Sequence, residues 1–218
     1  MYQLLIIRCT RRTKMKESFL DLYRKFNDDA KEINDKILLD FKNTGKEFAT
    51  QEVLSLWVSE CLIEDIDTIQ HLKENGFSNR YTDAIIRNMC EQVIEYLYIM
   101  KHQELIPIYF GKNIKVKYDE QGELFKAFKQ TGQARFGKRK SVKDMAADIG
   151  EWKSDDDKIS LYDIFSIKAE LEHNSYFHQI FDIIGEVEDG ENESEEADNL
   201  DYLFLTFILT AFLDIYYS

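Results

Sequence analysis

The chain has 218 residues, 44% of them apolar and 13% aromatic, with a net charge of −13. A chain of this length buries roughly 70% of its unfolded surface, so it can build a core without a partner. One proline and nine glycines are too few for the turns of a β-sandwich or barrel. We therefore expect an all-α, multi-helix bundle with a core of four to five long helices, short helices and an acidic loop.

The cysteines Cys9, Cys61 and Cys90 are widely spaced and form no Cys-x-x-Cys pair, which indicates neither a disulfide framework nor a zinc cluster. The apolar stretch 4–7 is followed, rather than preceded, by basic residues, which is the wrong order for a secretory signal. We expect a cytoplasmic protein with no metal and no cofactor. The basic residues crowded before Met15 suggest that residues 1–14 are a flexible leader and that 15–218 form a single domain.

Apolar side chains at three- and four-residue intervals predict a helix from Lys16 to about Phe41. Thr50 can cap a second helix, which Gly76 ends in a left-handed turn. A third helix, starting near Ser78 or Thr82 and running to about residue 102, gives the strongest helical pattern in the chain.

From 103 to 150 the pattern weakens, and we expect short helices there, one over 123–129 and one starting at the capping pair Ser141 and Asp144. A longer helix is predicted from Ser160 to His173.

A break at Asn174 and Ser175 should precede a helix over 176–184. Residues 186–199 hold eight acids and no basic residue, which indicates a solvated, mobile loop. The final helix begins at Leu200, and its apolar stretch of eleven residues, 203–213, falls short of the ~20 needed to cross a bilayer. No Lys or Arg flanks it, so we interpret it as a buried core helix and expect no membrane association.

Charge divides the chain, since residues 144–218 carry a net −17 and residues 1–143 a net +4. The first part contains a basic run without acids that could bind a phosphate backbone: Lys129, Arg135, Lys138, Arg139, Lys140 and Lys143. Such a run is more often simply solvated, or paired with an acidic segment of the same chain. Both interpretations stay open.

No common catalytic motif occurs: there is no His-Glu-x-x-His, phosphate-binding glycine loop, nucleophile elbow or dinucleotide fingerprint. Arg87 and Glu91 stand four residues apart on one face of the third helix, among apolar neighbours, and would form either a partly buried functional pair or an ordinary surface ion pair. His173 and His178 flank a helix break amid aromatic residues, where an imidazole could act as a general acid or base. A histidine in that place can equally cap the helix.

Two segments together resemble an uncharacterised bacterial branch of the HEPN-like helical superfamily: Ala84-Ile85-Ile86-Arg87-Asn88-Met89-Cys90-Glu91-Gln92-Val93-Ile94, and Leu161-Tyr162 through His173-Asn174-Ser175-Tyr176. The resemblance spans roughly residues 50–185, and it places Arg87, Glu91 and His173 at the branch's Arg-x-x-x-Glu helix and His-containing turn. It implies a bundle of four or five helices, frequent dimerisation and, in many members, a metal-independent ribonuclease in toxin or phage-defence systems.

The chain departs from the Arg-x4-6-His element of those ribonucleases, because Lys168 stands where the arginine would precede His173. Lysine lacks the planar, bidentate donor geometry of arginine, so either Arg87 supplies that group from another helix or cleavage is absent. Our first hypothesis is an RNA-binding or RNA-cleaving HEPN-like protein. Its predicted catalytic residues are Arg87, Glu91, His173 and His178, and its predicted RNA- or phosphate-binding residues are Lys168, Asn174, Arg135, Lys138, Arg139 and Lys140.

The alternative hypothesis is a non-catalytic acidic interaction protein, such as an antitoxin or accessory subunit, whose C-terminal part binds a basic partner. A third hypothesis is that Arg87, Glu91 and the turn at His173 form only a structural polar network within a helical scaffold. RNA, a basic protein and a second copy of the chain are thus the candidate partners.

Overall fold

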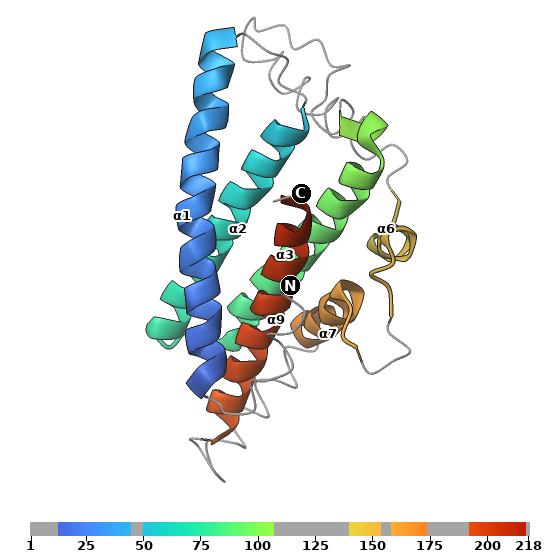
Figure 1. Ribbon diagram of the computed structural model, residues 1–218. Helices are drawn as coiled ribbons and strands as arrows, with labels where there is room; N and C mark the ends of the chain where they lie inside the picture. The colour runs from blue at the N-terminus through green and yellow to red at the C-terminus, as the bar shows by residue number, and fades with distance from the viewer. Residues whose placement is uncertain (1–12, 45–49, 107–139, 154–157, 174–191, 217–218) are drawn as a thin grey trace, which may run out of the picture.

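The computed structural model describes residues 13–44, 50–106, 140–153, 158–173 and 192–216. These residues contain six α-helices and one short 3₁₀ helix, and no strand. The helices pack against one another as a bundle (Figure 1), which confirms the all-α fold expected from the sequence.

Four long helices form the body of the bundle: α1 (Thr13–Thr44), α2 (Gln51–Glu74), α3 (Asn79–Lys101) and α9 (Asn192–Tyr216). Helix α3 packs against α2, α9 and two shorter helices, and α1 packs against α2 and α9. Figure 1 shows that α2 runs opposite to α1 and α3, whereas α9 runs in the same direction as these two. The end of α9 therefore lies near the start of α2.

The caps of α2 and α3 follow the sequence pattern. The Thr50 hydroxyl accepts a hydrogen bond from the Val53 amide at 3.3 Å, and Ser78 accepts one from the Arg80 amide at 3.4 Å. Gly76 has φ +67°, a left-handed conformation that glycine adopts without strain. The second and third predicted helices are thus confirmed, and the third begins at the earlier of its two candidate caps.

The shorter helices α6 (Val142–Ile149) and α7 (Leu161–His173) cover α3 on the side away from α1 (Figure 1). The Ser141 hydroxyl caps α6 by accepting from the Asp144 amide at 3.1 Å. Before α7, Ser160 and Asp163 form a reciprocal capping box, in which each side chain accepts from the other's backbone amide, at 3.1 and 2.9 Å. The 3₁₀ helix η3 (Gln103–Leu105) follows α3.

Two predicted boundaries need correction. Helix α1 begins at Thr13, so residues 13 and 14 are not part of a leader. Helix α9 begins at Asn192, so residues 192–199, predicted to be loop, are helical. Glutamate is a good helix former, and acids near a helix N-terminus interact favourably with its dipole, which explains how an acidic sequence starts a helix. The predicted helices over 123–129 and 176–184, the leader 1–12 and the loop 186–191 lie outside the described residues.

Helix α9 supplies much of the core, with these side chains at most 6% exposed: Tyr202, Phe204, Leu205, Ile208, Leu209, Phe212 and Leu213. Its window Asn199–Tyr216 is apolar enough, by length and composition, to cross a membrane, and 44% of that window is buried inside the bundle. That window takes in Asp201 and Asp214, which bound the eleven apolar residues 203–213.

Candidate functional site

Arg87 and Glu91 are both half-buried on α3. The Arg87 guanidinium carbon lies 5.9 Å from the ring centre of Phe165 on α7, within cation–π range, and its Nη2 donates to the Asn88 side chain at 3.3 Å. Arg87 thus helps to join α3 to α7.

His173 is the last residue of α7, eight residues after Phe165 and so about 12 Å further along the helix axis. The Arg87 contact with α7 therefore lies two turns before His173. The side chain of His173, together with Asn174 and His178, lies outside the described part, so a shared pocket with Arg87 stays a prediction.

Lys168 occupies the interior of the bundle. Its ammonium donates to Asp83 Oδ1 and to Asp201 Oδ1, both at 2.5 Å, and Lys73 donates to Asp201 Oδ2 at 2.8 Å. All four side chains are at most 7% exposed. This buried network joins α2, α3, α7 and α9 with two positive and two negative charges. An ammonium held in this way is not presented to solvent, so the structure lends no support to Lys168 as an RNA contact.

Of the predicted basic contacts, Arg135, Lys138 and Arg139 lie outside the described residues, whereas Lys140 is described. Its ammonium donates to Asp148 Oδ2 at 3.0 Å and lies 5.0 Å from the centre of the Tyr98 ring. Lys140 thus belongs to a set of groups at the end of α3 and on α6.

Asp148 on α6 is the centre of that set. Besides Lys140, its carboxylate contacts Lys101 Nζ at 2.9 Å and His102 Nε2 at 3.1 Å, and the Tyr98 ring lies against His102 with 4.6 Å between ring centres. We call Tyr98, Lys101, His102, Lys140 and Asp148 the Asp148 cluster. It forms here because α3 ends at Lys101, where cations interact favourably with the last carbonyls, and because α6 packs against α3.

Contacts within the cluster shift the pKa values of Asp148 and Lys140. Hydrogen bonds from Lys101, His102 and Lys140 keep the pKa of Asp148 well below its ordinary value, and the bond to Asp148 raises the pKa of Lys140. The cluster combines one carboxylate with two lysine side chains and an imidazole that is 29% exposed. Such a set can orient an imidazole, exchange a proton and attract an anion.

Lys143 and Trp152 form a separate exposed pair of a basic and an aromatic side chain. Lys143 on α6 lies 5.1 Å from the ring centre of Trp152, and Trp152 is 40% exposed. Exposed rings beside lysines are the combination that single-stranded nucleic acid uses for stacking and backbone contacts. Within the described residues, no three His, Cys, Asp or Glu side chains are placed to hold a metal ion.

A second charged surface lies on the outer side of α2, where Glu60, Glu64, Asp65 and Asp67 follow one another closely. Partial burial, with a smaller contribution from the Glu64 charge, raises the pKa of Asp65 to about 6. Asp67 accepts a hydrogen bond from Tyr23 at 2.6 Å. Glu60 likewise accepts a hydrogen bond from the Asn34 side-chain amide at 2.5 Å.

Sequence analysis did not identify the Asp148 cluster. Lys101 and His102 stand visibly at the end of a predicted helix, but Asp148 lies 46 residues after His102 and no spacing rule connects them. The chain matches no protein family model, and neither the curated proteins nor the solved structures gave a match.

Proposed function

We propose that this protein binds RNA through the Asp148 cluster. The observation that carries the proposal is that Lys101, His102 and Lys140 all contact the one carboxylate of Asp148. Two ammoniums offer a site for a phosphate, and the exposed ring of Trp152 offers a surface for base stacking. Lys140 is the first residue of the basic run, expected to contact RNA, that the structure describes.

We further propose that His102 exchanges a proton with the bound phosphodiester. Asp148 fixes the imidazole through Nε2, as a carboxylate orients a catalytic histidine in other enzymes. The imidazole would accept the 2′-hydroxyl proton or donate one to the leaving oxygen, while the lysines stabilise charge on the phosphate. This chemistry uses no metal ion. The proposed activity is the one that the HEPN resemblance implies, in a toxin or defence setting. The proposed catalytic histidine, however, is His102 instead of His173.

Binding is tested by fluorescence anisotropy with a labelled single-stranded oligoribonucleotide. The double variant Lys101→Ala/Lys140→Ala should bind at least about ten-fold more weakly at low salt. The matched control, Lys25→Ala/Lys31→Ala, removes the same charge from exposed positions on α1 and should bind like the wild type. Equal affinity of the two double variants would refute the assignment of the site.

Cleavage is tested on the same RNA by gel electrophoresis. His102→Ala should lose cleavage by roughly 10²–10⁴-fold, the usual contribution of a general acid or base, and retain binding. His71→Ala, which removes an exposed histidine of α2, should cleave like the wild type. If the wild type does not cleave, or if His102→Ala cleaves equally well, the catalytic part of the proposal is wrong, whereas RNA binding is judged by anisotropy alone.

The acidic surface of α2 favours a second candidate function, as an accessory protein or antitoxin that binds a basic protein. Crowding of Glu64 against Asp65 is the observation that supports it. A basic partner captured from host extract at low salt should be lost with Glu60→Gln/Glu64→Gln and retained with Glu17→Gln/Glu32→Gln, which changes exposed acids of α1. Equal capture by both variants would show that the acidic surface of α2 does not bind the partner.

A further inference from the structure

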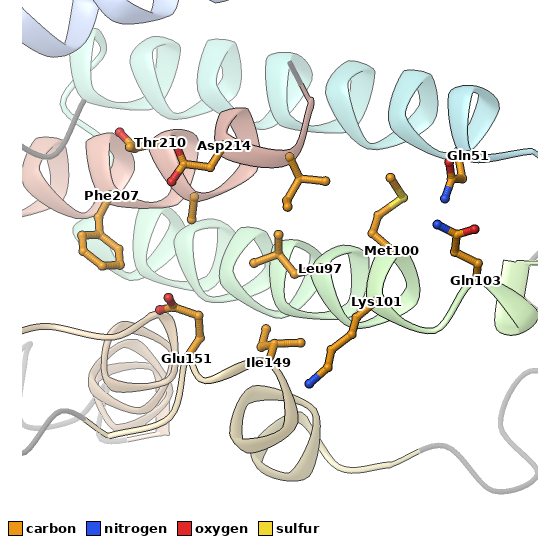
Figure 2. A pocket seen from close by; sticks show the side chains of 12 residues that line it. Gln51, Leu97, Met100, Lys101, Gln103, Ile149, Glu151, Phe207, Thr210 and Asp214 are labelled. Carbon is orange, nitrogen blue, oxygen red and sulfur yellow. The ribbon is translucent and has the colours of Figure 1, made fainter. Parts of the chain in front are cut away.

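A pocket of about 630 Å³ lies where α2 begins and where α3 and α9 end. Figure 2 shows that its walls come from these three helices and from the chain at the end of α6. The volume falls within the ~300–1,000 Å³ typical of small-molecule sites. The apolar part of the wall includes Leu97, Met100, Phe207 and Ile215.

Two carboxylates, those of Glu151 and Asp214, belong to the same wall. In Figure 2 the Glu151 carboxylate points towards the side of the pocket where α9 carries Asp214. Burial and, to a smaller degree, the Asp214 charge raise the pKa of Glu151. One oxygen of Glu151 accepts the Leu161 amide at 3.3 Å, which fixes the side chain at the start of α7. The two acids thus place negative charge beside an apolar surface.

The remaining ionisable group of the wall, Lys101, does not neutralise this charge. Its ammonium is directed to Asp148, whose carboxylate oxygen lies 2.9 Å away and whose backbone oxygen accepts from it, and Figure 2 shows it pointing towards α6. Within the described part of the chain, the charged groups that face the pocket are therefore the two carboxylates. An anionic ligand would meet repulsion there, whereas a cation would be attracted.

We infer that this pocket binds a small primary amine with an apolar body, the ammonium lying between Glu151 and Asp214 and the body against Leu97, Met100 and Phe207. An ammonium donates three hydrogen bonds and so can serve both carboxylates. The apolar body leaves water for a surface that is already formed. The pocket shares Lys101 with the Asp148 cluster, but the groups that would bind the amine are Glu151 and Asp214, which lie outside that cluster.

The inference is tested by isothermal titration calorimetry with three probes of similar shape: 4-phenylbutylamine, 4-phenylbutanol and 4-phenylbutyrate. The amine should bind wild-type protein at least about ten-fold more tightly than the alcohol, and the carboxylate should bind least. Equal binding of amine and alcohol, or no binding of the amine, would overturn the proposal.

Variants locate the site. Glu151→Gln keeps an oxygen to accept the Leu161 amide, and should weaken amine binding by roughly ten-fold or more while leaving the alcohol unaffected. Glu170→Gln, an exposed acid on α7, should bind like the wild type. Ala211→Leu adds bulk to the pocket wall and should weaken both probes. Circular dichroism confirms that each variant is folded, and undiminished amine binding by folded Glu151→Gln or Ala211→Leu would place the amine elsewhere.

Discussion

The buried network predicts a large and specific loss of stability when one of its charges is removed. Lys168→Met keeps most of the side-chain volume but takes the ammonium from between Asp83 and Asp201, each 2.5 Å from it. The ion-pair partner of Asp83 at 2.5 Å is then lost, and Asp83 and Asp201 are carboxylates at most 4% exposed. Breaking a buried pair in this way costs about 3–5 kcal/mol, because the remaining charge is isolated from water.

Urea unfolding followed by circular dichroism at neutral pH measures the effect. The double variant Lys168→Met/Asp83→Leu restores charge balance and should recover at least about 2 kcal/mol of the loss, since apolar residues can replace a buried ion pair at little cost. The control Lys36→Met breaks the exposed pair with Glu32 and should cost under about 0.5 kcal/mol. A loss below about 1 kcal/mol in Lys168→Met, or no recovery in the double variant, would refute this reasoning.

Three further predictions concern other charged groups. Because the pKa of Asp65 is raised to about 6, the folded protein binds more protons than the unfolded chain between pH ~4 and ~6. Stability should fall as pH rises through that range, and Asp65→Asn should reduce the slope and stabilise the protein at neutral pH by about 1 kcal/mol after allowance for solvent screening; an unchanged slope in melting curves would contradict this. The lowered pKa of Asp148 stabilises the fold above the ordinary aspartate pKa of ~4, so melting temperature should drop below that pH more steeply in the wild type than in Asp148→Asn; parallel curves would count against it. Arg87→Ala should lower the free energy of unfolding by about 1 kcal/mol, because the contact with Phe165 is lost. RNA binding measured by anisotropy should not change. Loss of RNA binding in the folded variant would show that Arg87, rather than the Asp148 cluster, belongs to the RNA site.

Local signals in the sequence predicted the helices well where the cap and the apolar stripe agree. Thr50 and Ser78 cap α2 and α3, and Gly76 has the left-handed turn expected of it. These features depend on residues within one turn of each other, so the sequence alone contains the information. Helix α9 was placed too late because its acidic start was interpreted as solvated loop, although glutamates also favour a helix N-terminus.

The candidate site was harder to predict, because it depends on how helices pack. The sequence pointed to Lys168 through its distance from His173, yet the partners of Lys168 are Asp83 and Asp201, 85 and 33 residues away. The contact between His102 and Asp148 likewise depends on α6 lying against the end of α3. A periodic pattern shows which face of a helix is buried, but it does not show which polar groups of two faces will meet.

The salt dependence of RNA affinity tests the central claim most directly, because it counts the lysines that contact phosphate. For single strands, the slope of log affinity against log salt concentration changes by about 0.7 for each phosphate contact. Lys101→Ala/Lys140→Ala should therefore lower the magnitude of the slope by about 1.4 relative to the wild type, and Lys25→Ala/Lys31→Ala should leave it unchanged. Identical slopes for all three proteins, or no RNA binding by the wild type at low salt, would contradict the claim that the Asp148 cluster binds RNA.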